Sequence, residues 1–268
     1  MKNIIVILFA FVAIFSLNSC DNEPLEGFDL SSPNGATTNP DGSNGNGNGG
    51  TSSGDYYPRA IDNEWTYSFN VNGTTQTLIT KLTNSFVNNS NTVFESEQQT
   101  VSIGNTSANV AGFIYKNGGN YYAYSNGSSF DFAGTYTATQ TGVPNYIFLK
   151  DNVPVGATWS VAYSQTTNYT PSQQGIPNIP DVVTNTTIDF EIEEKDISVV
   201  VNGVTYSPVI NVKATNTSSI AGTNTETENI SYNYYALDVG LIKIESTGTN
   251  SSGSSTTTES LLTSYILN

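Results

Sequence analysis

The chain has 268 residues, of which 37% are hydrophobic and only 12% are charged, so neutral hydrogen-bonding side chains supply most of its polarity. Eight Lys and Arg residues against 23 Asp and Glu residues give a net charge of −15, which disfavours binding to nucleic acids because their phosphates are also negative. The chain contains no His and one Cys, which excludes His-dependent catalytic triads, His-bound zinc and intrachain disulfide bonds.

Residues 1–19 have the pattern of an export signal. Lys2 precedes an uncharged apolar run over residues 4–15, which is shorter than the roughly 20 residues needed to cross a bilayer. Ser19 then precedes Cys20, the only Cys of the chain. This arrangement resembles the signal peptide and lipobox of bacterial lipoproteins, which implies cleavage before Cys20 and attachment of acyl chains such as palmitate to that residue. Several acyl chains make membrane attachment durable.

The acidic residues that follow Cys20 indicate where in the cell envelope the protein is located. Asp21, Glu23 and Glu26 resemble the acidic signal that sends some Gram-negative lipoproteins to the outer face of the outer membrane. The same residues fit a solvated acidic tether equally well. We therefore expect a lipid-anchored protein of the cell outer membrane, either surface-exposed or facing the periplasm.

Residues 20–54 are interpreted as the lipidated Cys and a flexible linker rich in Gly, Asn and Ser. Such a stretch buries too little apolar surface to offset the entropy of ordering it. Residues 41–49 have too few acidic ligands for a calcium loop and lack its closing Glu, so we predict no metal site there.

Residues 55–268 are predicted to form one β-rich globular domain, because apolar and polar residues alternate in short runs broken by Gly and Asn. Turns are predicted at Asn72-Gly73, at Asn117-Gly118-Gly119 and at Asn202-Gly203. A long surface loop is predicted over residues 171–180. Strands are predicted at 65–69, 78–79, 92–101, 110–116, 121–124, 130–139, 145–149, 158–168, 187–193, 197–201, 204–212, 227–236, 240–247 and 256–267.

No part of this domain sustains a helical apolar period, and tight turns between successive strands favour antiparallel pairing. The predicted fold is therefore all-β: an antiparallel curved sheet, or a partly closed barrel or sandwich, of about a dozen strands.

Two segments of the domain resemble a group of bacterial lipoproteins of uncharacterised function. The first is Tyr56-Tyr57-Pro58 with the following segment 63–67 (NEWTY), and the second is segment 234–245 (YYALDVGLIKIE). Position 62 or 63 is usually Gly in that group, whereas this chain has Asp62-Asn63. The resemblance implies a β-rich exported domain and carries no established catalytic residues. Some relatives resemble the curved half-barrel of periplasmic lipoprotein carriers.

Paired carboxylates are the candidate catalytic groups, because glycosides can be hydrolysed without His. Alternation places Glu191 and Glu193 on one face about 7 Å apart, within the range of inverting glycosidases, and Glu194 and Asp196 follow closely. The same residues fit the solvent face of a strand followed by a charged turn. We favour that interpretation and predict a protein without enzymatic activity or cofactor.

Tyrosines are the candidate ligand-binding residues, because a Tyr ring presents an apolar face with a polar tip. Cross-strand stabilisation of a sheet explains alternating Tyr residues at least as well. Trp65 and Trp159 are predicted to be core anchors. The candidate tyrosines are Tyr121, Tyr122, Tyr124, Tyr232, Tyr234 and Tyr235.

Three functional hypotheses follow. A binding or assembly module, which we favour, predicts an aromatic cluster exposed on one face, with an envelope protein or a glycan as partner. A carrier of lipid or lipoprotein predicts a hollow sheet lined by Val, Ile, Leu and Phe. A hydrolase predicts a cleft with two converging carboxylates. In each case the membrane is reached through the lipid on Cys20, and no nucleic acid is bound.

Overall fold

The computed structural model describes residues 50–71, 74–87, 92–103, 106–124, 128–132 and 135–268. The predicted signal peptide, Cys20, most of the predicted linker and the Asn72-Gly73 turn lie outside the described residues. Within the described ranges, no helix is long and apolar enough to cross a membrane.

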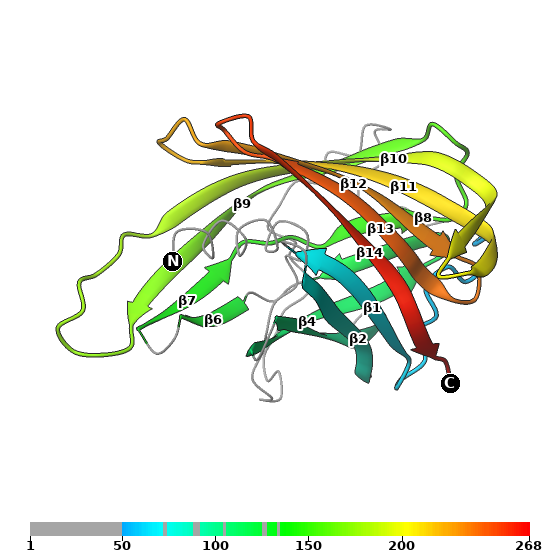
Figure 1. The fold of residues 1–268 in the computed structure, drawn as a ribbon, viewed down its shortest axis with the longest axis horizontal. Helices are drawn as coiled ribbons and strands as arrows, with labels where there is room; N and C mark the ends of the chain where they lie inside the picture. Colours follow the sequence, from blue (N-terminus) through cyan, green and yellow to red (C-terminus); the bar gives the residue numbers. More distant parts are fainter. Residues whose placement is uncertain (1–49, 72–73, 88–91, 104–105, 125–127, 133–134) are drawn as a thin grey trace.

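The described residues form a single antiparallel sheet, which confirms the all-β prediction (Figure 1). Its order is β6-β7-β9-β10-β11-β12-β13-β14-β1-β2-β3-β4-β5-β8, so the sheet is curved but open, with β6 and β8 at its edges. The strands are β1 (Glu64–Val71), β2 (Thr74–Val87), β3 (Val93–Ile103), β4 (Thr106–Asn117), β5 (Asn120–Tyr124), β6 (Ser128–Phe132), β7 (Tyr136–Thr141), β8 (Tyr146–Lys150), β9 (Thr158–Pro171), β10 (Val182–Val201), β11 (Val204–Ile220), β12 (Glu226–Ala236), β13 (Gly240–Thr249) and β14 (Ser255–Ile266).

Most neighbours in the sheet are also neighbours in sequence, and three pairings depart from that rule. β1 pairs with β14, so the first and last strands lie side by side, with Trp65 opposite Tyr265. β8 pairs with β5, whereas the β6–β7 hairpin pairs with β9 at the other end of the sheet. The chain therefore crosses between the two ends of the sheet and returns, which brings β8 close to β9.

Alternation along the strands defines an inner, concave face and an outer face. Ile188, Phe190 and Ile192 of β10 are buried on the inner face, as the alternation in the sequence predicted. The two predicted core anchors are confirmed, because Trp65 is completely buried and Trp159 is 4% exposed.

Two of the predicted turns are confirmed. β4 and β5 are joined around Gly118 and Gly119, with Asn117 paired to Asn120. Asn202 and Gly203 join β10 to β11, and both have positive φ, at 49° and 82°. Such a backbone suits Asn and Gly because neither is strongly disfavoured in the left-handed region. Residues 172–181 form the predicted loop between β9 and β10.

Two strand predictions were wrong in their extent. The single strand predicted at 130–139 is two strands, β6 and β7, which form a hairpin. The separate strands predicted at 187–193 and 197–201 are parts of one strand, β10. The register of β10 against β11 shifts at Glu194, and Asp196 has φ 59°. β10 therefore continues through β-bulges that contain the charged residues for which the sequence suggested a turn.

The two segments that carry the family resemblance contact each other. Trp65 donates from Nε1 to the Val239 carbonyl at 2.6 Å, and the Tyr67 hydroxyl donates to the Leu241 carbonyl at 3.0 Å. Gly240 has φ 105°, and a Cβ there would lie 3.2 Å from Trp65 Nε1. Asp62 has φ 68°, a left-handed conformation that Asp tolerates.

Trp159 joins β9 to β8 where the sheet is open. Its Nε1 donates to the Ile147 carbonyl of β8 at 2.8 Å, and its ring stacks on Phe190 with 5.3 Å between centroids. We expect Trp159→Phe to keep the stacking but leave that carbonyl without its donor, lowering the free energy of unfolding by about 1–2 kcal/mol. Urea denaturation measures this effect. An unchanged midpoint would show that this hydrogen bond does not stabilise the junction.

Candidate functional site

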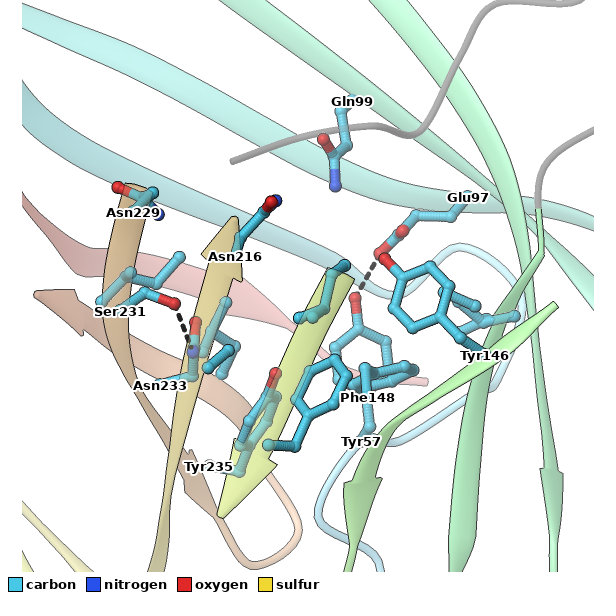
Figure 2. A pocket seen from close by; sticks show the side chains of 17 residues that line it. Tyr57, Glu97, Gln99, Tyr146, Phe148, Asn216, Asn229, Ser231, Asn233 and Tyr235 are labelled. Carbon is cyan, nitrogen blue, oxygen red and sulfur yellow. Dashed lines mark hydrogen bonds between the residues drawn. The ribbon is translucent and has the colours of Figure 1, made fainter. Parts of the chain in front are cut away.

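The concave face contains a cavity of about 160 Å³ that is partly open to solvent. Strands β3, β4, β5 and β8 line one side and β10 to β13 line the other, so the curvature of the sheet creates the cavity (Figure 2). Its polar lining consists of Glu97, Gln99, Asn216, Asn229, Ser231 and Asn233. Its aromatic lining consists of Tyr57, Tyr146, Phe148, Phe190 and Tyr235, and its aliphatic lining of Ile114, Ala123, Ile188, Ala214, Leu241 and Ile244.

One wall is a row of polar side chains on β12. Asn229, Ser231 and Asn233 occupy alternate positions and therefore share the inner face, with Tyr235 next in the row (Figure 2). Asn233 donates from Nδ2 to Ser231 Oγ at 3.0 Å and to the Val212 carbonyl at 3.2 Å. Asn229 Oδ1 accepts from Ser246 Oγ at 2.7 Å, so neighbouring strands hold these amides in place.

Aromatic rings line the cavity from both of its sides. The Phe148 centroid lies 5.6 Å from that of Tyr57 and 6.1 Å from that of Tyr235. Burial raises the pKa of Tyr57, Tyr146 and Tyr235, so their hydroxyls stay neutral hydrogen-bonding groups at physiological pH.

Glu97 is the charged group of the cavity. It lies on β3 between Leu82 of β2 and Gly112 of β4 and is only 3% exposed. The Tyr57 hydroxyl donates to its carboxylate (Figure 2). Burial raises the pKa of Glu97 to about 6, and the hydrogen bond from Tyr57 offsets part of that rise. The carboxylate is therefore mostly ionised at neutral pH although it is buried.

Gln99 lies two residues further along β3 and faces the same cavity (Figure 2). Its side chain is 7% exposed, and its Oε1 has no hydrogen-bond partner among the described residues. A buried carbonyl oxygen without a donor is costly, so this atom is an acceptor available to a ligand.

A second polar cluster lies outside the cavity and is centred on Asp151, which is fully buried. Its carboxylate accepts from the Ser53 backbone N–H at 3.0 Å and from Ser52 Oγ, and lies 3.5 Å from Lys116 Nζ. The Tyr121 hydroxyl lies 3.2 Å from the same carboxylate. These contacts fix residues 52 and 53, which belong to the segment predicted as linker, against the β4–β5 hairpin.

The structure does not bring the six candidate tyrosines to one place. Tyr235 lines the cavity, and Tyr121 is buried on the inner face, where Lys116 Nζ donates to its hydroxyl at 2.6 Å. Tyr122 and Tyr124 lie on the outer face of β5. Tyr232 and Tyr234 lie on the outer face of β12, and the Tyr234 hydroxyl donates to Glu245 at 2.9 Å. A ligand-binding role for any of the six stays a prediction.

Tyr122 and Tyr124 belong to an aromatic cluster on the outer face of β2 to β5. Tyr122 stacks on Tyr115 with 4.3 Å between centroids, and Phe86 stacks on Phe94 at 5.2 Å. The rings cover one another, so Phe94 is only 5% exposed. The cluster consists of Phe86, Phe94, Phe113, Tyr115, Tyr122 and Tyr124.

The predicted carboxylate pair lies away from the cavity. Glu191 and Glu193 alternate with the buried residues of β10, and Glu193 pairs with Lys213 at 3.3 Å. Among the residues that line the cavity, Glu97 is the only carboxylate. In the described part of the chain, no three Asp, Glu, His or Cys residues are placed to hold a metal ion.

The fold and the cavity define an open, curved antiparallel sheet with a small interior site. No family model matches the sequence, and no curated protein matches it. In structure the chain is similar to a protein assigned as exported, with a YmcC-like fold, from Bacteroides fragilis: TM-score 0.52, 10% identity, covering 79% of this chain and 98% of the other. It is also similar to a protein assigned as a lipoprotein from Parabacteroides distasonis: TM-score 0.49, 11% identity, covering 79% and 98%. The first likeness establishes a YmcC-like fold.

Proposed function

We propose that this protein is a lipid-anchored, non-enzymatic binding protein of the cell envelope, attached to the outer membrane through Cys20. The export signal and lipobox of residues 1–20 support the anchor. The Bacteroides fragilis protein with the same fold is assigned as exported, which agrees with an envelope location. An envelope protein or a glycan as a further partner stays a prediction.

The mixed lining of the cavity is the observation that carries the binding role. It combines aromatic rings with amide side chains and one carboxylate, and Gln99 Oε1 lacks a donor. Sites for small polar ligands combine apolar walls with a few fixed polar groups in this way. The cavity is the concave centre of the sheet, so the ligand is held between its two sides.

The lining favours this role over the two alternatives. A carrier of acyl chains needs a large apolar hollow, whereas this cavity has about 160 Å³ and six polar lining residues. A glycosidase of the usual kind needs two converging carboxylates, whereas the described lining supplies only Glu97.

The anchor is tested by comparing the wild-type chain with Cys20→Ala in cells. We expect the wild-type protein to fractionate with the outer membrane and its Cys20 peptide to carry the mass of acyl chains, and the variant to be released from the membrane. Protease treatment of intact cells then separates a surface location, where the domain is digested, from a periplasmic one. An exported wild-type protein with an unmodified Cys20 would contradict the proposal.

A further inference from the structure

We infer that the cavity binds a small organic cation with a primary ammonium group, with the Glu97 carboxylate as counter-ion and Gln99 Oε1 as a second acceptor. This inference rests on the proposed function, because it names the class of ligand that the cavity takes.

The charge of the cavity is the first argument. Glu97 is 3% exposed, and no Lys or Arg is among the described lining residues. Arg59 forms a 2.7 Å ion pair with Glu95, and Lys116 lies with Asp151. Lys150 of β8 lies over the Trp159 ring, 5.2 Å from its centroid. A buried carboxylate without a cation is unfavourable, so a cationic ligand would supply the partner that the protein lacks.

The hydrogen-bonding groups are the second argument. Glu97 and Gln99 share one face of β3, about 7 Å apart along the strand. The Glu97 carboxylate and the Gln99 side chain both line the cavity, and Gln99 Oε1 has no donor among the described residues. An ammonium group has three donors and no acceptor, so it satisfies both oxygens at once.

The aromatic wall is the third argument. Tyr57, Tyr146, Phe148 and Tyr235 line the cavity that holds Glu97, and Tyr57 and Tyr146 lie beside Glu97 (Figure 2). Faces of aromatic rings attract cations, most strongly where water is excluded. Neutral polyols also bind to rings and amides, but they do not neutralise the carboxylate. Charge is therefore the property that discriminates between the two classes of ligand.

A matched pair of probes tests this inference. Ethanolamine and ethylene glycol have nearly the same size, and only ethanolamine carries an ammonium group. We expect isothermal titration calorimetry of the full mature chain at pH 8 to give ethanolamine an affinity at least about tenfold higher than that of ethylene glycol. Glu97→Gln should weaken ethanolamine binding by at least about tenfold. Asp189→Asn, which removes one charge from the exposed outer face of β10, should leave it unchanged.

Two further measurements keep the outcome decisive. Gln99→Glu adds a second carboxylate and should strengthen ethanolamine binding, which a merely damaged cavity would not do. Lowering the pH from 8 to 5 should weaken binding to the wild type. Tyr57, Tyr67, Tyr146 and Tyr235 face Glu97 and stay neutral in that range, because burial raises the pKa of each.

Equal affinity for the two probes, or a preference for ethylene glycol, would overturn the cationic ligand while leaving a binding cavity in place. Ethanolamine binding that Glu97→Gln does not alter would also overturn it. Absence of lipid on Cys20 would contradict only the proposed envelope anchor, so the two failures are distinguishable.

Discussion

Replacing Asp151 by alanine is expected to lower the free energy of unfolding by about 3 kcal/mol. Removal of one partner from a buried ion pair leaves the other charge less well compensated, which destabilises the folded state. Lys116 would lose its closest carboxylate, keeping Asp55 at 3.8 Å and hydrogen bonds to Tyr121 and the Gly54 carbonyl. Ser53 N–H would lose its acceptor as well. Denaturation of the variant in urea measures the loss.

Glu259→Ala is the matched control, because it removes a carboxylate from an exposed ion pair. Glu259 is 49% exposed and lies 3.2 Å from Lys243, which Glu245 also contacts. Such surface pairs contribute about 1 kcal/mol or less. Limited proteolysis gives a second, local comparison of the two variants. Asp151→Ala should make residues 50–54 sensitive to protease, whereas Glu259→Ala should not. Equal effects of the two substitutions would show that the Asp151 cluster does not hold the N-terminal segment in place.

The sequence gives little sign of this cluster. Asp151 lies in Lys150-Asp151-Asn152 between two strands, which reads as an ordinary polar turn. Its burial depends on Ser52 and Ser53, about 100 residues earlier, which lie in a stretch of composition typical of a flexible linker. The local sequence pattern cannot reveal this contact, because each of the two contacting segments has a sequence typical of exposed loops.

Strands and tight turns could be predicted where local chemistry decides them. Asn202-Gly203 needs two residues that tolerate positive φ, and the alternation of Ile188, Phe190 and Ile192 with charged residues defines one buried face. The pairing of β1 with β14 could not be predicted, because it joins residues about 200 apart. The continuity of β10 was missed because a bulge and a turn share the same polar residues.

The cavity was also missed, for a related reason. Glu97 and Gln99 alternate with Ser96, Gln98 and Thr100, so both faces of β3 are polar in sequence. Without an apolar face to mark the inside, neither residue is distinguished from solvent-exposed neighbours. The tyrosines were visible as clusters, but adjacent residues of a strand point to opposite faces. Tyr234 and Tyr235 therefore lie on opposite sides of the sheet.

Glu97→Gln is expected to stabilise the protein at pH 8 by up to about 2 kcal/mol. The pKa of Glu97 is about 6 in the folded state against an ordinary value of 4.5. Because the folded pKa is the higher one, stability from this group is fully present below pH 4.5 and is lost as the pH rises through 6. Each tenfold change in proton affinity corresponds to about 1.4 kcal/mol. Glutamine carries no charge there, and its carbonyl still accepts from Tyr57.

Urea denaturation at several pH values tests whether Glu97→Gln raises the free energy of unfolding in this way. The difference between Glu97→Gln and the wild type should be near zero at pH 4, should grow between pH 4.5 and 6, and should stay constant above that range. Asp189→Asn, on the exposed face of β10, should give a difference that hardly varies with pH. A variant less stable than the wild type at pH 8 would mean that the ionised carboxylate is already compensated in the free protein. The expected gain in stability instead means that the ionised Glu97 carboxylate destabilises the free protein. Functional sites often keep groups that lower stability in this way. A cationic ligand would offset the charge when it binds and would thereby stabilise the folded state.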